Sequence, residues 1–256
     1  MIELAVLDIA GTTVDEHGAV YLALEQAVRA AGGAPTAADI QRWMGAGKRE
    51  AITALLTPAP SQAPSPSRAG IPSAAESPSL AESSSLALAG PPSGPPGPDV
   101  VEAAFADFRA RLSAAYAARP PAPLPGVPEA ITALRAAGVK VALTTGFDRE
   151  VTTALLAAVG WDDGFLDAVV CVDDVPCGRP APYMIFRAME ATGVRDVGRV
   201  LTAGDTVRDL QAGTNAGARV VAGVLTGGQD AVTLGAVRHT HLLPSVADLP
   251  ALLRLR

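Results

Sequence analysis

Short apolar runs alternate with helical patterns through the second half of this 256-residue chain, and this alternation limits the possible fold more than any other feature. Apolar runs occur at 139–143, 168–172, 200–203, 219–224 and, more weakly, 240–243; helical patterns occur at 129–137, 148–159, 182–192, 207–216 and 246–253. Strands that alternate with helices form a parallel sheet whose crossover helices cover its faces. A further apolar run, Leu4–Leu7, opens the chain. The sequence therefore predicts an α/β protein with a Rossmann-like parallel sheet as its core.

The region between the first strand and the alternating half is predicted to be an inserted α-helical cap domain. Helical patterns occur at 20–31, 37–44, 48–56 and 100–118. Residues 57–99 are instead rich in Pro, Ser, Ala and Gly, so we expect a disordered insertion with at most a short helix at 80–88. The predicted domains are 1–17 and 119–256 for the core and 18–118 for the cap.

Composition and charge limit the classes of partner. The net charge is −6 and no basic run is present, so nucleic acid is not an expected partner. A small anionic substrate fits, because a few Arg and Lys side chains in a pocket outweigh the global charge. The chain has no signal-peptide pattern at its start and no apolar run of membrane-spanning length, so we expect a cytoplasmic protein that does not contact a membrane.

Polar residues follow four of the predicted strands. They are Asp8, the pair Thr144-Thr145, Arg179 at the end of a loop, and Asp205. Parallel sheets bind ligands at the carboxyl ends of their strands, and an aspartate there can act as a nucleophile or hold a metal ion. Taken singly each residue also fits an ordinary turn or helix cap, so the argument depends on their coincidence.

The stretch Asp8-Ile9-Ala10-Gly11-Thr12 resembles the first motif of the haloacid dehalogenase superfamily, Asp-x-Asp-Gly-Thr. The other three strand ends match the remaining motifs in order. The resemblance implies a haloacid dehalogenase-like core in which Asp8 attacks phosphorus and becomes an aspartyl phosphate. The second Asp of that motif, which protonates an alcohol leaving group, is replaced here by Ala10. This replacement resembles the phosphonatase branch, that is, phosphonoacetaldehyde hydrolase and its relatives.

The same resemblance implies a Mg²⁺ cofactor. Its ligands would be Asp8, the backbone carbonyl of Ala10, Asp205 and, directly or through water, Asp209. Mg²⁺ prefers hard oxygen ligands of this kind, and it would screen the charges of the nucleophile and the substrate. For Asp209, a simple exposed position on a helix fits the sequence nearly as well.

The resemblance also implies a set of phosphoryl-binding residues. Thr144 or Thr145 would donate a hydroxyl hydrogen bond to a phosphoryl oxygen, with Thr12 and Gly146 beside them. Arg179 occupies the third motif, where most of the superfamily has Lys and the phosphonatase branch has Arg. A guanidinium can bind phosphoryl oxygens through two parallel hydrogen bonds. The alternative for Arg179 is a surface residue that precedes a helix.

Met44-Gly45-x-x-Lys48 resembles the cap segment of phosphonatase, in which Gly45 would line the substrate site and Lys48 would form a Schiff base with the substrate aldehyde. An iminium accepts the electrons of the breaking carbon–phosphorus bond, which explains why no acid is needed. Taken alone, Lys48 would be a solvated charge at the start of a helix. Two positions depart from phosphonatase: its proton-relaying histidine is Ala51 here, and its tyrosine is Phe147.

The expected function is Mg²⁺-dependent hydrolysis of a small phosphonate at its carbon–phosphorus bond, with a small phosphorus compound as the partner. One alternative is an ordinary phosphomonoesterase of the same superfamily, although its alkoxide product would need the missing acid. Another is a non-catalytic binding or scaffold protein that uses the Pro-rich insertion. The resemblance also implies a possible homodimer formed through the cap.

Overall fold

The computed structural model describes residues 1–57, 95–161 and 164–255. Most of the predicted insertion, including the possible helix at 80–88, lies outside these residues. The structure does describe the last residues of the predicted insertion, 95–99. There the prediction of disorder is wrong for Pro98 and Asp99, which begin helix α4 (Pro98–Ala118). Proline fits the first turn of a helix, where its missing N–H would have no partner.

A six-stranded parallel sheet forms the centre of the core, in the order β5-β4-β1-β6-β7-β8. The strands are β1 (Leu4–Asp8), β4 (Lys140–Thr145), β5 (Ala168–Cys171), β6 (Val200–Gly204), β7 (Val220–Val224) and β8 (His241–Leu243). Every pair in this sheet is parallel, which confirms the predicted fold class. After β1 the chain adds β4 and β5 on one side of this strand and then β6, β7 and β8 on the other. The strand order therefore reverses beside β1, and parallel sheets of this kind bind ligands at that point.

Helices cover both faces of the sheet. They are α5 (Val127–Ala136), α6 (Arg149–Ala158), α7 (Tyr183–Thr192), α8 (Val207–Ala216), α9 (Ala231–Gly235) and α10 (Leu249–Leu252), with 3-10 turns at Val172–Asp174, Val197–Arg199 and Val246–Asp248. Alternate residues of β1 point to opposite faces of the sheet. Leu4 and Val6 pack in the same apolar cluster as α7 and α8. Ala5 and Leu7 pack in the cluster that contains α5 and α6. The helix α9 was not predicted, and the expected closing helix at 246–253 is a 3-10 turn followed by the short α10.

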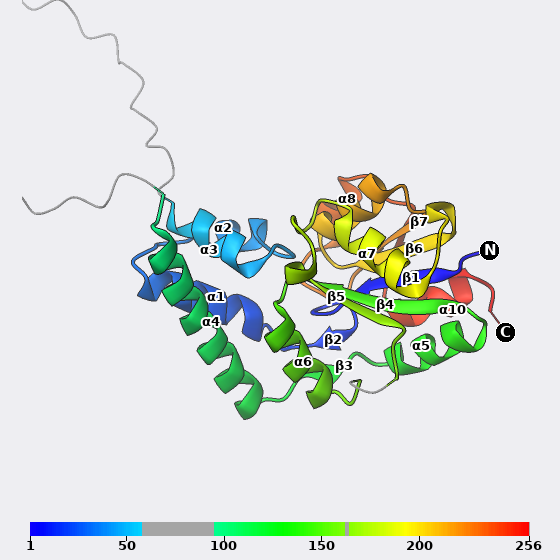
Figure 1. Cartoon of the computed structure of the whole chain (residues 1–256), viewed down its shortest axis with the longest axis horizontal. Helices are drawn as coiled ribbons and strands as arrows, with labels where there is room; N and C mark the ends of the chain where they lie inside the picture. Colours follow the sequence, from blue (N-terminus) through cyan, green and yellow to red (C-terminus); the bar gives the residue numbers. More distant parts are fainter. Residues whose placement is uncertain (58–94, 162–163, 256) are drawn as a thin grey trace, which may run out of the picture.

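Helices α1 (Ala19–Ala30), α2 (Ala37–Arg42) and α3 (Lys48–Leu56) form a helical cap together with α4. In Figure 1 these helices lie together on one side of the molecule, and both chain termini lie on the side away from them. The helices α1, α3 and α4 pack on one another through apolar residues, among them Leu24, Ile52 and Phe108. Phe105 and Phe108 of α4 therefore belong to the apolar core of the cap.

Two very short strands join the cap to the sheet. Strand β2 (Val14–Asp15) leads into the cap, strand β3 (Ala122–Pro123) leads out of it, and the two pair antiparallel. The second crossing lies in a Pro-rich stretch, residues 120–125. This paired crossing lies close to the predicted boundaries at 17/18 and 118/119, which themselves stay predictions.

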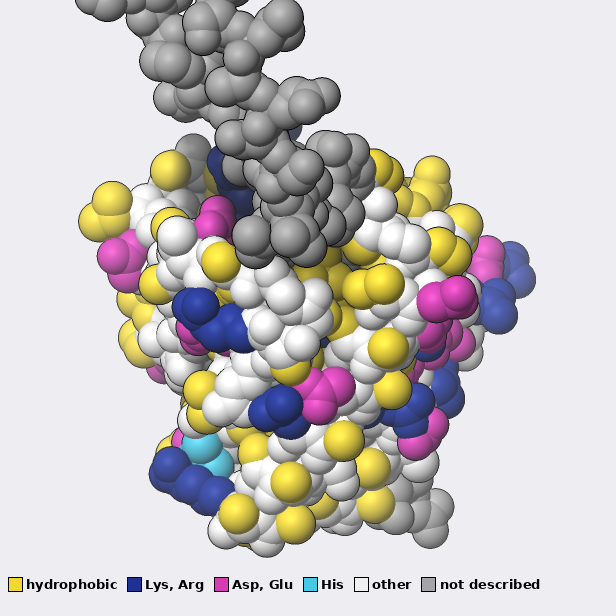
Figure 2. Space-filling view, turned by 90° about the vertical axis from the view of Figure 1, so that its left-hand side faces the viewer, with side chains coloured by type: hydrophobic (Ala, Val, Ile, Leu, Met, Phe, Trp, Pro, Cys, Tyr) yellow, Lys and Arg dark blue, Asp and Glu magenta, His cyan; other side chains and the backbone are white. Residues whose placement is uncertain are grey.

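Charges are mixed on the face shown in Figure 2, where basic and acidic side chains stand next to each other outside the area that the grey atoms cover. Among the described residues, no helix is both long enough and apolar enough to cross a bilayer.

Candidate active site

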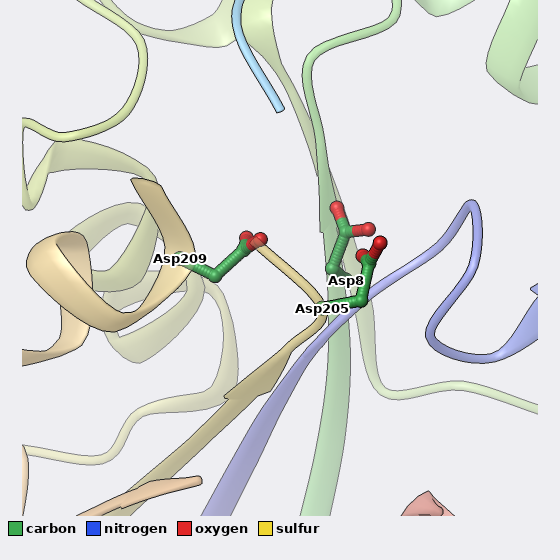
Figure 3. Close-up of side chains that lie close together, drawn as sticks. All are labelled: Asp8, Asp205 and Asp209. Carbon is green, nitrogen blue, oxygen red and sulfur yellow. The ribbon is translucent and has the colours of Figure 1, made fainter. Parts of the chain in front are cut away.

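Three aspartates converge at the carboxyl ends of the central strands. Asp8 ends β1, Asp205 follows β6, and Asp209 lies in the first turn of α8. Each offers an oxygen such that all three oxygens lie within 4.8 Å of one another, and all three residues are buried. Figure 3 shows the carboxylates of Asp8 and Asp205 beside each other, with Asp209 extending toward them from its helix. The topology thus brings together residues separated by about two hundred positions in the chain.

A local capping motif fixes Asp209. The hydroxyl of Thr206 caps α8, and the carboxylate of Asp209 accepts hydrogen bonds from the Thr206 hydroxyl and from its backbone N–H, the latter at 3.1 Å. The other oxygen of Asp209 lies 2.6 Å from Arg179 Nη1. Asp209 is therefore a buried member of the site, and the alternative of an exposed helix residue is wrong.

Arg179 joins two of these carboxylates. Its Nη1 also lies 2.6 Å from Asp8 Oδ1, and its Nη2 donates a 2.8 Å hydrogen bond to Thr144 Oγ1. The side chain is almost fully buried, so the alternative of a surface arginine is wrong. Burial opposes its charge, but Asp209 and Asp8 hold the pKa of Arg179 above its usual value. The guanidinium therefore stays cationic next to the candidate nucleophile.

Negative charge exceeds positive charge in this cluster. Burial raises the pKa of Asp8 to about 6, although Arg179 opposes the rise. Burial and the charges of Asp8 and Asp209 raise the pKa of Asp205 to about 8. Three buried carboxylates beside one guanidinium form an arrangement that a further cation stabilises.

The donor set around Asp8 fits Mg²⁺. The carbonyl oxygen of Ala10 accepts no hydrogen bond within the described residues, so it is free to serve as a ligand. Asp205 is held by the hydroxyl of Thr12 at 2.9 Å and by the backbone N–H of Gly228 at 3.1 Å. Carboxylate and carbonyl oxygens with room for water are the ligands that Mg²⁺ prefers.

The three predicted phosphoryl-binding threonines differ in their surroundings. The hydroxyl of Thr12 donates to Asp205, so its side chain supports that carboxylate rather than pointing to a ligand. Thr145 Oγ1 accepts a 3.1 Å hydrogen bond from the backbone N–H of Phe147, and Thr144 Oγ1 accepts from Arg179. Neither Thr144 nor Thr145 donates its own hydroxyl hydrogen within the described residues, so both can donate to a ligand.

Lys48 reaches the site from the cap. It is the first residue of α3, only 6% of it is exposed, and its Nζ donates a 3.1 Å hydrogen bond to the carbonyl of Ala46. The Nζ also lies 5.2 Å from the centre of the Phe147 ring. Burial lowers the pKa of Lys48 to about 8, against the opposing effect of Asp8. The reading of Lys48 as a solvated charge is therefore wrong.

Two glycines allow the cap to lie directly on the core. A Cβ atom on Gly146 would come within 2.5 Å of the carbonyl oxygen of Ala46, and one on Gly45 within 2.6 Å of Thr206 Oγ1. Gly45 also has a positive φ of 76°, which glycine adopts without strain. Beside these contacts a cleft of about 440 Å³ opens between cap and core, lined among others by Lys48, Gly146 and residues 175–178.

Three polar residues outside the predicted motifs have pKa values raised by burial, which the sequence did not indicate. Glu16, in the crossing between core and cap, is 6% exposed, and Tyr21 and Tyr116 are largely buried aromatic residues of α1 and α4. Burial and the charges of Asp205 and Asp8 raise the pKa of Tyr21. For Glu16 alone the sequence holds a signal: it lies two residues before Gly18, the N-cap of α1, where a carboxylate can accept hydrogen bonds from the first N–H groups of the helix.

Similarity to known proteins agrees with this geometry. The sequence profile of the haloacid dehalogenase-like hydrolases matches residues 2–217. A phosphonoacetaldehyde hydrolase from Bacteroides fragilis is 37% identical over 123 residues, which is 48% of this chain and 46% of that protein. The chain thus spans less than half the length of the curated relatives it matches.

Solved structures share the fold. A hydrolase from Pseudomonas syringae aligns with a TM-score of 0.75 at 19% identity, covering 98% of both chains. A phosphonoacetaldehyde hydrolase-like protein from Oleispira antarctica aligns with a TM-score of 0.73 at 20% identity, covering 99% of this chain and 91% of that one. The profile match over most of the chain, together with this fold and the clustered motifs, shows that the protein belongs to the haloacid dehalogenase-like hydrolase family.

Proposed function

We propose that the protein hydrolyses the carbon–phosphorus bond of a small phosphonate that carries a carbonyl group, phosphonoacetaldehyde or an analogue of it. The observation that carries this proposal is the buried Lys48 amine, which lines the cleft between cap and core and whose pKa is lowered by burial to about 8. Ala10 at the position of the usual acid supports the same reading, since an enamine leaving group needs no proton from an aspartate. The curated relatives named phosphonoacetaldehyde hydrolase make this substrate class the first to test.

Asp8 is the proposed nucleophile. Its carboxylate would attack phosphorus, the carbon–phosphorus bond would break, and water would then hydrolyse the aspartyl phosphate. Arg179 and the hydroxyls of Thr144 and Thr145 would bind the phosphoryl oxygens and hold phosphorus in line with Asp8. Bound Mg²⁺, held by Asp8, Ala10, Asp205 and Asp209, would neutralise charge between nucleophile and substrate.

Lys48 is the proposed activator of carbon. Its neutral amine would attack the substrate carbonyl and form an iminium, which takes up the electron pair of the departing carbon. A lowered pKa leaves a larger share of neutral amine near neutral pH than an exposed lysine has. We further propose that residues 18–118 act as a cap that closes over the substrate and excludes water.

A phosphomonoesterase of the same family is the second candidate. The shared core and the Asp8–Arg179 pair support it equally, because both reactions begin with attack on phosphorus. The burial of Lys48 counts against it, since desolvating an ammonium is unfavourable and an esterase has no use for the neutral amine. A non-catalytic scaffold protein would not need three carboxylates and Arg179 buried together, because burying charged groups is unfavourable.

Reductive trapping separates these candidates. The chain has two lysines, Lys48 and Lys140, and Lys140 is exposed on β4 in an ion pair with Asp167. With phosphonoacetaldehyde and borohydride we expect a reduced adduct on Lys48, found by intact mass and peptide mapping. The adduct is lost in Lys48→Ala and kept in the matched control Lys140→Ala.

Phosphate release completes this test. We expect Mg²⁺-dependent release that disappears in both Asp8→Ala and Lys48→Ala. If phosphate esters are hydrolysed instead, with no adduct and with activity retained in Lys48→Ala, the protein is a phosphatase and the phosphonatase proposal is wrong.

A further inference from the structure

The position of the Lys48 amine depends on the short stretch of chain before it. Lys48 Nζ donates its hydrogen bond to the carbonyl of Ala46, and the backbone N–H of Ala46 donates a 3.3 Å hydrogen bond to the carbonyl of Trp43. Residues 43–46, which we call the lysine segment, therefore form a turn that holds the amine. Whatever fixes this turn on the core also fixes the amine in the cleft.

The lysine segment rests on the core residue by residue. Its four contacts with the core are Trp43 with Arg208, Met44 with Gly228, Gly45 with Thr206 and Ala46 with Gly146. In three of these pairs the core residue is a glycine or a threonine. Arg208 is the member of the set with a charged side chain, so its contact is examined further for a role in holding the segment.

The guanidinium of Arg208 contacts the cap on both sides of Lys48 in the sequence. Its central carbon lies 4.8 Å from the centre of the Trp43 ring, within the range of a cation–π contact. Its Nη1 lies 4.0 Å from Oε1 of Glu50, which follows Lys48 in the first turn of α3. One core side chain thus contacts the cap before and after the lysine.

The same guanidinium is bonded to the loop that carries Arg179. Its Nη1 donates a 3.0 Å hydrogen bond to the backbone carbonyl of Arg179, whose own side chain is paired with Asp8. Asn215, also of α8, donates a 2.8 Å hydrogen bond to the next carbonyl, that of Pro180. Helix α8 therefore holds this loop at two points, and Arg208 connects the loop to the lysine segment.

The stability of α8 itself does not explain an arginine at this position. Arg208 is the second residue of the helix, where the positive end of the helix dipole disfavours a cation. Only 18% of its side chain is exposed, so it is not a solvated charge. The contacts with Trp43, Glu50 and the Arg179 carbonyl offset both effects, and all three lie outside the helix.

We infer that Arg208 is a positioning residue for imine formation, because it fixes the lysine segment to the Arg179 loop and so sets the separation between the Lys48 amine and the phosphoryl-binding guanidinium. This inference rests on the proposed function. In phosphonoacetaldehyde the carbonyl carbon is bonded directly to the carbon that carries phosphorus. The amine and the guanidinium must therefore match one fixed spacing, and reaction is fast only when the reacting atoms are held at that spacing.

The decisive variant is Arg208→Ala, assayed by borohydride trapping over a range of phosphonoacetaldehyde concentrations. A misplaced amine reacts slowly even when substrate is bound, so the trapping rate at saturation should fall by about ten- to a hundredfold. The concentration at half-saturation should change by less than about threefold, because the side chains that bind the phosphoryl group remain. The control Arg187→Ala, an exposed arginine of α7, should change neither quantity.

A double-mutant cycle tests whether Arg208 acts through the lysine segment. Trp43→Leu removes the ring that the guanidinium contacts and should also slow trapping at saturation. Residues that act through a shared contact give non-additive effects, so the double variant should lose less than the product of the two single losses. Losses that multiply would show that the two residues act independently, and would overturn the inference.

The remaining outcomes separate this inference from the proposed function. No adduct in the wild-type protein overturns both. A normal trapping rate at saturation in Arg208→Ala overturns the inference and leaves the proposed function intact, whether Tm falls or the half-saturating concentration rises. If Arg208→Ala does not fold, as judged by thermal unfolding, Trp43→Leu decides: a slower rate at saturation supports the inference, and an unchanged rate overturns it.

Discussion

Gly146 of the core lies directly beneath Ala46 of the cap, so closely that a Cβ atom on Gly146 would come within 2.5 Å of the Ala46 carbonyl oxygen. That carbonyl in turn accepts the hydrogen bond from Lys48. The absence of a side chain at position 146 therefore sets how closely the cap approaches the core and where the Lys48 amine lies in the cleft between them.

Gly146→Ala is expected to push the cap loop away from the core. A misplacement of about 1 Å at a reacting group costs on the order of a hundredfold in rate, so kcat for phosphonate hydrolysis should fall by about ten- to a hundredfold. Steady-state kinetics and thermal unfolding check this. The control is Gly97→Ala, where a Cβ meets no described atom within 4 Å. Unchanged kcat in Gly146→Ala would contradict the close approach.

Arg179→Met should destabilise the protein. It leaves the carboxylates of Asp8 and Asp209 buried without their cation, and losing one partner of a buried ion pair costs about 3–5 kcal/mol in the free energy of unfolding. Urea unfolding without divalent cations measures it. The matched control Arg187→Met breaks an exposed pair with Glu190 and should cost less than about 1 kcal/mol. Equal costs in the two variants would show that the buried cluster is not the source of the effect.

Mg²⁺ should stabilise the folded protein. At a hundredfold excess over the dissociation constant the gain is about 2.7 kcal/mol, which for a chain of this size corresponds to roughly 5–10 °C in Tm. Asp205→Asn should raise Tm without Mg²⁺, because one of three mutually repelling carboxylates is gone, and should abolish the shift on adding Mg²⁺. Asp107→Asn, in an ion pair with Arg111 on α4, should leave the shift unchanged. A full shift in Asp205→Asn would exclude this residue as a ligand.

Adduct formation on Lys48 should rise with pH and then level off. Burial lowers the pKa of Lys48 to about 8, so the neutral amine that attacks the carbonyl grows about tenfold per pH unit below 8 and stays nearly constant above it. The rate of reductive trapping between pH 6 and 10 measures this. An amine that keeps the ordinary lysine pKa would still gain in rate between pH 9 and 10, and that outcome would contradict the burial argument.

Local patterns in the sequence were sufficient for most of the helices and strands and for the order of the motifs. Alternating apolar runs predicted the parallel sheet, and Thr206 followed three residues later by Asp209 is a capping pattern that fixes the start of α8. The missed elements are short. Helix α9 has five residues, β2 and β3 have two each, and the pairing of β2 with β3 joins segments that the whole cap separates in the sequence. No local pattern contains that information.

By itself the sequence determined the candidate chemical groups of the site. Motifs made of neighbouring residues along the chain identify them: Asp8, Lys48, Arg179 and Asp205. Only the tertiary structure decided between a buried and an exposed position for the residues that the sequence left open. Asp209 is buried and pairs with Arg179, and Lys48 is buried at the start of α3. The physical reason is that burial and the distance between charges depend on the packing of elements far apart in the sequence, and these two quantities set proton affinity and charge.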